Sequence, residues 1–163
     1  MEVKRKIVLL VFVLTLAIAS NAQSYDKIDL SVFPNVQFVQ PDPPKQIKGW
    51  TFIETPEGDE LVVSQLAGDY PAKILKFQFQ GDAVGIAVIS SSDSGIIEFS
   101  VDNQPWQKRD LYVDNTRAVR YFTLEPELKA AKHMLQLRIS SQKNPESDGY
   151  KCVLTQFYFN KTE

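Results

Sequence analysis

The sequence predicts an all-β domain built as an antiparallel β-sandwich. Apolar and polar residues alternate over short windows along much of the chain, which is the period of a strand with one buried face. Clusters of Ser, Asp, Asn, Gly and Pro separate these windows roughly every 10 to 20 residues, as in sandwiches. The one helix-like window, residues 125–132, is too short to be stable without packing, so we expect a turn or a single helical turn there.

The chain before the predicted domain is expected to be extended. Residues 23–47 form this lead-in, because prolines gather near its end, and proline lacks a backbone donor and restricts the residue before it. Val36 and Phe38 are candidates for an edge strand within the lead-in. The β-sandwich domain itself is expected over residues 48–160.

The strands of this domain differ in how they are expected to be buried. Residues 83–89 are apolar on both faces, which indicates a central strand covered on both sides. In a later window Leu135, Leu137 and Ile139 alternate with polar residues, so only one face is expected to be buried. The expected strands are 50–53, 61–64, 75–79, 83–89, 97–101, 106–113, 119–124, 135–140 and 151–159.

The first residues have the pattern of an export signal. A basic start precedes an apolar run over residues 7–19, and Ser20 and Ala22 place small side chains where signal peptidase requires them. The apolar run is shorter than the roughly 20 residues that cross a bilayer core, and no positive charges follow it. We therefore expect residues 1–22 to be a cleaved signal peptide, and the protein to be periplasmic or extracellular, with no membrane attachment after cleavage.

Composition argues against several classes of partner and fold. The formal net charge is −2 at pH 7, which is unsuited to nucleic acid and to anionic membrane surfaces. Cys152 is the single cysteine, so the chain is not a small secreted domain held by disulfides. Its place in a strand-like window predicts a buried, unreactive thiol.

Residue patterns that would support catalysis or metal binding are scarce. His133 is the single histidine and no Gly-x-Ser-x-Gly elbow accompanies it, so we expect a partly buried histidine at a strand start rather than a general base. One histidine and one distant cysteine are too few for a zinc site. The carboxylate pairs Asp102 with Asp110, or Asp93 with Glu98, could act on glycosides, but turn aspartates usually bond their own backbone. The sequence predicts no catalytic residue, metal or cofactor.

Aromatic residues supply the remaining candidate site. Trp106 follows a turn, and Tyr112 and Tyr121 lie shortly after it. Aromatic faces stack on the C–H-rich faces of sugars, and neighbouring polar side chains bind hydroxyl groups. The candidate hydroxyl partners are Asp110, Arg117 and Arg120. The alternative is that Trp106 is a core or rim residue of the sandwich, since large aromatic residues also dominate cores.

Several segments also resemble a known module. They are residues 76–86 (KFQFQGDAVGI), 95–102 (GIIEFSVD), 105–106 with 110–112, 135–139 and 143–149. Together they resemble the jelly-roll β-sandwich, similar to a carbohydrate-binding module, that accompanies SGNH/GDSL-type hydrolases. These include carbohydrate-esterase-like enzymes of polysaccharide-degrading bacteria. The resemblance covers about residues 73–160, and residues 48–72 more loosely.

The chain departs from this module at two places. Residues 102–105 (DNQP) stand where the module commonly has Asp-Gly-Gly-Pro, and residues 116–120 stand where a His-containing segment is common. The nucleophile and Asp-x-x-His blocks of the hydrolase domain are absent from this sequence. The resemblance therefore implies a secreted, non-catalytic module that binds carbohydrate or assists a glycan-acting hydrolase. The alternatives are a structural or protein-interaction module that docks on a separate hydrolase or surface complex, and a divergent hydrolase.

Overall fold

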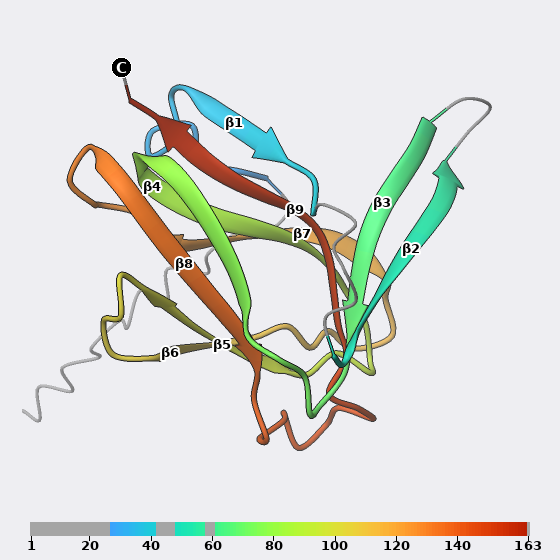
Figure 1. Cartoon of the computed structure of the whole chain (residues 1–163). Coiled ribbons are helices and arrows are strands. Elements are labelled where there is room, and N and C mark those ends of the chain that lie inside the picture. The colour runs from blue at the N-terminus through green and yellow to red at the C-terminus, as the bar shows by residue number, and fades with distance from the viewer. Residues whose placement is uncertain (1–26, 42–47, 58–60, 163) are drawn as a thin grey trace, which may run out of the picture.

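Figure 1 shows the computed structural model of the chain, which describes residues 27–41, 48–57 and 61–162. Within these ranges the protein is all-β and no helix occurs. Accordingly, the described part contains no helix long and apolar enough to cross a membrane. The predicted signal peptide, residues 1–22, lies outside the described residues.

Nine strands form one hydrogen-bonded system, and all pairings between them are antiparallel. They are β1 (Val36–Val39), β2 (Trp50–Glu57), β3 (Leu61–Gly68), β4 (Leu75–Ser90), β5 (Ile96–Val101), β6 (Gln107–Asp110), β7 (Ala118–Glu125), β8 (Ala131–Ile139) and β9 (Cys152–Lys161). Their order is β2-β3-β9-β4-β8-β5-β6, with β1 beside β9 and β7 beside β4. The predicted fold class, an all-β antiparallel sandwich, is confirmed.

The long strand β4 belongs to both layers of the sandwich. Its first half pairs with β8, whereas its second half pairs with β9 on one side and β7 on the other. The register shifts between Gly81 and Ala83, and such a bulge lets a strand turn from one layer into the other. One layer thus holds β6, β5, β8 and the start of β4, and the other holds β7, β9 and the end of β4 (Figure 1).

The hydrophobic core lies between the two layers. Its buried residues come from the inward positions of both, and they include Leu75, Val84, Ile86, Phe99, Phe122, Leu135, Leu137, Ile139 and Leu154. Residues 83–89 are buried throughout, as the apolar run predicted. Their second face is covered because Phe33 packs edge-to-face on Tyr158, with ring centroids 4.9 Å apart, in a smaller cluster that includes Ala83.

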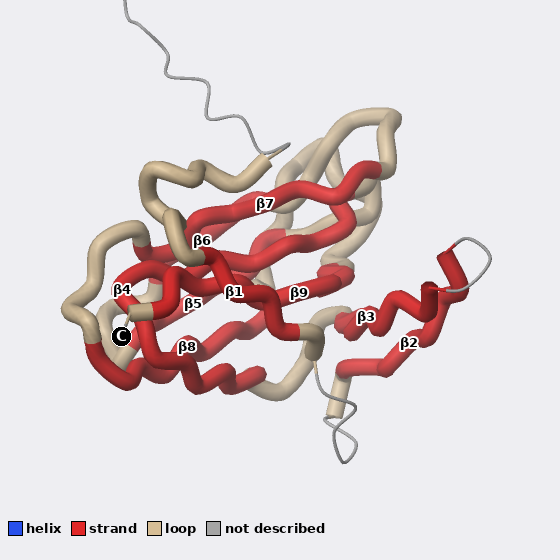
Figure 2. Tube along the Cα trace, turned by 90° about the horizontal axis from the view of Figure 1, so that it is seen from above, coloured by secondary structure: helices blue, strands red, loops and turns tan. Residues whose placement is uncertain are grey.

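Several element boundaries differ from the sequence expectation. The candidate edge strand at Val36 and Phe38 is confirmed, because β1 pairs with β9 over residues 36–39. Strands β2 and β3 are longer than expected, and together they project from the body as a two-stranded ribbon (Figure 2). The expected strand over residues 106–113 is shorter in the structure, where β6 covers only Gln107–Asp110. The N–H of the buried Leu111 still bonds to Gly95 O at 3.1 Å, in register with β5. Residues 126–130 form a loop with no helical turn.

Candidate functional site

Trp106 lies immediately before β6 and stands outside the buried core, with 36% of its surface exposed. The guanidinium carbon of Arg138, on β8, lies 4.1 Å from the centroid of the indole ring, which is a cation–π contact. Glu98 on β5 pairs directly with Arg138 in the strand register. Because side chains alternate along a strand, these residues share the outer face of the β6–β5–β8 layer.

Glu98 fixes the position of Arg138. Its Oε2 accepts a hydrogen bond of 2.6 Å from Arg138 Nε and forms an ion pair with Arg138 Nη2, also at 2.6 Å. Its Oε1 accepts a hydrogen bond of 3.0 Å from Ser140 Oγ. Burial pulls the pKa of Glu98 upward, but the bonds from Arg138 and Ser140 outweigh it and hold this pKa below its ordinary value. Glu98 is therefore ionised at neutral pH.

Two further polar side chains complete this surface. Lys108 Nζ lies 3.7 Å from Glu98 Oε1 and donates a hydrogen bond of 2.7 Å to Gln142 Oε1. We call the set Trp106, Arg138, Glu98, Lys108 and Gln142 the Trp106 face. It offers an exposed aromatic ring whose supporting cation is held in place, and it offers amide and ammonium groups beside that ring.

The turn before Trp106 is tied to the strand that carries Arg138. Asp102 and Asn103 have φ values of 50° and 61°, as in the turns that close tight hairpins. Asp102 N donates to Met134 O at 3.0 Å, and its Oδ1 accepts from Met134 N at 2.9 Å. Asn103 Oδ1 accepts a hydrogen bond of 2.7 Å from Gln136 Nε2. The turn therefore cannot move without breaking contacts to β8.

His133 supports the same turn from within the sandwich. It is 8% exposed and lies near the start of β8, in agreement with the sequence expectation. Its Nδ1 lies 2.6 Å from Asp102 Oδ2, and its Nε2 lies 2.7 Å from Lys129 O. Both ring nitrogens are thus engaged by protein oxygens. Burial lowers the pKa of His133, but the bonds to Asp102 and Lys129 outweigh it and raise this pKa above its ordinary value.

Asp110 and Tyr112 lie along the same edge as Trp106. Trp106, Lys108 and Asp110 occupy alternate positions at and before β6, so they point to one face. The carboxylate of Asp110 is engaged, because Oδ1 accepts from Tyr112 N at 3.0 Å and Oδ2 accepts from Asn144 Nδ2 at 2.6 Å. Desolvation and the negative charge of neighbouring carboxylates raise the pKa of Tyr112.

The three candidates near β7 do not join the Trp106 face. Arg117 is exposed just before β7, in the other layer. Arg120 and Tyr121 are successive residues of β7 and so point to opposite faces. The guanidinium carbon of Arg120 lies 5.4 Å from the Phe122 ring centroid, whereas Tyr121 packs edge-on against Tyr158 at 6.2 Å. The predicted six-residue cluster is thus divided between two layers.

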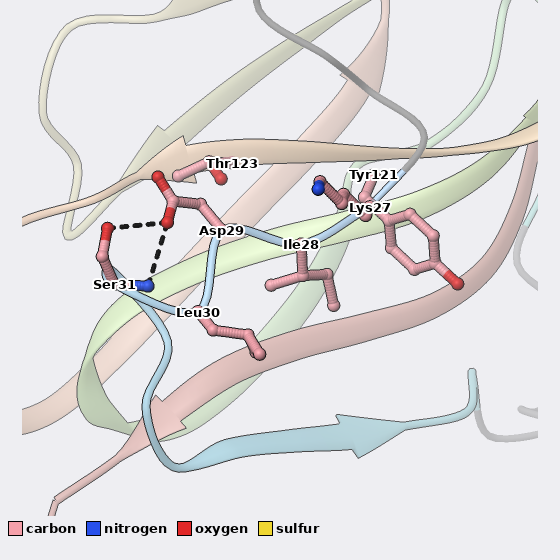
Figure 3. Close-up of a pocket in the computed structure, with 7 residues that line it drawn as sticks. All are labelled: Lys27, Ile28, Asp29, Leu30, Ser31, Tyr121 and Thr123. Carbon is pink, nitrogen blue, oxygen red and sulfur yellow. Dashed lines mark hydrogen bonds between the residues drawn. The ribbon is translucent and has the colours of Figure 1, made fainter.

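Tyr121 instead lines a groove on the outer face of β7, shown in Figure 3. The groove has a volume of about 540 Å³. Its walls are Tyr121 and Thr123 from β7, and Lys27, Ile28, Asp29, Leu30 and Ser31 from the segment before β1. Asp29 Oδ1 accepts hydrogen bonds from Ser31 Oγ at 2.6 Å and Ser31 N at 2.9 Å. Sequence reasoning found Tyr121 but missed this facing segment, because no local pattern marks it.

The two carboxylate pairs considered from sequence are not brought together as free acids. Asp102 bonds to His133 and Asp110 bonds to Asn144, near opposite ends of β6. Asp93 Oδ2 lies 2.5 Å from Lys151 Nζ, and Glu98 is held by Arg138. Each carboxylate is therefore committed to a partner within the fold.

Metal and thiol chemistry find little support among the described residues. No group of three or more His, Cys, Asp or Glu side chains in the described ranges could hold a metal ion. Cys152 is buried, as predicted, and burial raises the pKa of its thiol to about 12. A thiol with such a pKa is a weak nucleophile at neutral pH, because the thiolate is the reactive form.

Comparison with known proteins gives matches of fold only. No family model and no curated protein matches the sequence. Among solved structures, a family two carbohydrate esterase from Cellvibrio japonicus matches with a TM-score of 0.51 and 19% identity, over 78% of this chain and 34% of that chain. A two-domain esterase (CEX) active on acetylated mannans, co-crystallised with mannopentaose, matches with a TM-score of 0.60 and 11% identity, over 80% of this chain and 38% of that chain.

A third match is a xanthan lyase from Paenibacillus. Its TM-score is 0.50 at 19% identity, over 71% of this chain and 12% of that chain. This chain therefore spans well under half of each of these proteins. At these identities the similarity establishes a shared β-sandwich fold.

Proposed function

We propose that this protein is an exported, non-catalytic β-sandwich module that binds carbohydrate through the Trp106 face. The observation that carries the proposal is the partly exposed indole of Trp106, which is supported by Arg138 and flanked by Lys108 and Gln142. A sugar ring can stack on such an indole, while the neighbouring amide and ammonium groups bind its hydroxyls.

The solved structures of similar fold support a setting among glycan-acting enzymes. Two of them are described as carbohydrate or mannan-active esterases and one as a xanthan lyase, and this chain matches only part of each. The jelly-roll module that the sequence resembles likewise accompanies SGNH/GDSL-type hydrolases. A module that binds polysaccharide and thereby assists such a hydrolase, in the periplasm or outside the cell, fits these similarities and the predicted signal peptide.

The engagement of the acid and base groups supports a non-catalytic role. A general base must be within reach of a substrate proton, and both nitrogens of His133 already contact protein oxygens. Nucleophilic catalysis also needs a base beside the nucleophile. The described residues hold no second histidine that could serve.

A second candidate function is that of a protein-interaction module. Phe38 and Val39 on β1 are 49% and 37% exposed, and Ile53 on β2 is 37% exposed. Exposed apolar side chains on edge strands favour contact with another protein. In that case the partner would be a separate hydrolase or a surface complex, and the Trp106 face would have no glycan ligand.

Affinity electrophoresis of the purified protein in gels containing acetylated mannan, xylan or xanthan tests the proposal. The parent should be retarded by at least one polysaccharide. Trp106→Ala should weaken binding about five- to 150-fold, because an aromatic stacking partner contributes on the order of 1–3 kcal/mol by analogy with nucleic-acid bases. Tyr70→Ala is the matched control, since Tyr70 is also partly exposed but lies in the loop before β4.

Two results would count against carbohydrate binding at this face. One is retardation of Trp106→Ala equal to that of the parent. The other is the absence of retardation of the parent in every gel, together with capture of a hydrolase through β1. Thermal unfolding of each variant shows that any loss of binding is not a loss of folding.

A further inference from the structure

We propose that His133 is the positioning residue of the Trp106 face, and that loss of its proton loosens the turn before Trp106 and weakens glycan binding as the pH rises. This inference rests on the proposed function and adds a form of regulation to it. It starts from what lies on the two sides of the His133 ring.

Both neighbours of the ring nitrogens are acceptors. Asp102 Oδ2 lies 2.6 Å from Nδ1, and the carbonyl oxygen of Lys129 lies 2.7 Å from Nε2. Neither an ionised carboxylate nor a carbonyl can donate a hydrogen bond, and a neutral imidazole has only one N–H. Only the doubly protonated imidazolium satisfies both contacts, so this geometry is that of a charged His133.

The remaining surroundings of the ring agree with a positive charge. Asp102, directly after β5, is the charged side chain that acts on the ring. Burial raises the pKa of Asp102, but the bond from His133 outweighs burial and lowers the pKa of this carboxyl below its ordinary value. The backbone of Gly81, on β4, also favours the charged form. The ring of Phe79 lies 5.4 Å away, centroid to centroid, and carries no formal charge. The β7–β8 loop contributes the Lys129 carbonyl.

Asp102 transmits this state to the Trp106 face. Asp102 Oδ1 accepts a hydrogen bond from Met134 N, and the N–H of Asp102 donates one to Met134 O. The φ of 50° at Asp102 lies in the left-handed region that aspartate adopts in tight turns. When His133 is neutral, one of its ring nitrogens has no proton. If this is Nδ1, the hydrogen bond to Asp102 is lost, and if it is Nε2, the hydrogen bond to Lys129 O is lost. With either tautomer the ion pair between His133 and Asp102 is lost, so the turn is held less tightly, four residues before the indole that stacks on Arg138.

The direction of the effect with pH follows from the raised pKa of His133. The restraint is complete below the ordinary histidine value of 6.5 and is lost as the pH rises through the higher value in the folded protein. The ion pair acts on the indole only through the turn, so its loss should weaken binding by the contribution of one ordinary hydrogen bond, roughly two- to tenfold.

NMR of the parent protein tests the proposal in two steps. The His133 ring carbon–proton resonances should titrate with a midpoint above 6.5, and Asp102→Asn should lower that midpoint. The indole N–H resonance of Trp106, assigned by comparison with Trp106→Phe, should shift with the His133 midpoint. Asp93→Asn, which breaks an ion pair away from β6, is the matched control and should leave both midpoints unchanged.

Glycan affinity is then measured across the same pH range. The parent should lose affinity with the His133 midpoint, and His133→Gln should bind with an affinity that no longer changes over this range. If the chemical shift of the Trp106 indole N–H does not change as His133 titrates, the positioning role is refuted, whether or not a glycan binds. A resonance that follows the titration in a protein that binds no glycan supports the positioning role and refutes the proposed function instead.

Discussion

Replacement of Glu98 by glutamine removes the charge that holds Arg138 beneath the Trp106 indole. The Glu98 side chain is only 13% exposed, accepts hydrogen bonds from Arg138 Nε and Ser140 Oγ, and forms an ion pair with Arg138 Nη2. Breaking a fully buried ion pair costs about 3–5 kcal/mol. Because the Arg138 side chain is 41% exposed and can be hydrated when unpaired, we expect Glu98→Gln to lower the free energy of unfolding by about 1–3 kcal/mol. Urea denaturation at pH 7 measures this difference.

The loss of stability caused by Glu98→Gln should depend on pH, in a direction that follows from the pKa shift of Glu98. The pKa of Glu98 is lowered in the folded protein, so its contribution is complete above its ordinary value of 4.5 and is lost as the pH falls through the lower folded value. The stability difference between parent and Glu98→Gln should therefore shrink in acid. Asp93→Asn is the control, since the partly exposed pair of Asp93 with Lys151 should contribute at most about 1 kcal/mol. A Glu98→Gln effect no larger than this control at pH 7 would refute the argument.

Two further predictions concern the fold and the proposed non-catalytic role. Gly85→Ala should lower the free energy of unfolding by about 1–3 kcal/mol or more, because a Cβ there would enter the ring of the fully buried Tyr158; thermal denaturation that leaves the variant as stable as the parent would show that the ring can move aside. Acetylated sugars and nitrophenyl esters should be hydrolysed no faster by the parent than by His133→Ala, and a rate that this single change abolishes would make the protein an esterase.

The strands were predictable because burial imposes the period of two on the sequence. Residues 83–89 and 135–139 lie in β4 and β8 with the expected faces buried. The sequence predicted two strands, over residues 75–79 and 83–89, because Gly81 and Asp82 resemble a turn. This was wrong, since both segments belong to the single strand β4. In the structure Gly81 lies at the bulge where β4 pairs with β9, and a Cβ there would collide with Asn160 O. A close approach between residues so distant in sequence leaves no local pattern.

The candidate site was predictable only in its parts. Trp106 and Asp110 could be singled out by residue type, and both lie on the β6 edge. Arg138 was missed, and Glu98 was considered only as a partner of Asp93. The pairing of Arg138 with Glu98 could not be predicted because they are 40 positions apart and meet only through the register of β5 on β8. The separation of Tyr121 from Trp106 likewise follows from the placement of β7 in the opposite layer, which alternation along one strand does not reveal.

Strand β8 supports the proposed binding surface from both of its faces. Arg138 supports the indole on the outer face, while His133, with its side chain on the buried face, holds the turn that leads to it. Sites whose supporting residues lie on strands are held more precisely than sites on loops. If β8 is the common support, Arg138→Ala and Asp102→Asn should each weaken glycan binding, and the double variant should lose less than the sum of the two effects. Additive losses, measured by affinity electrophoresis, would mean that the indole and the turn are held independently.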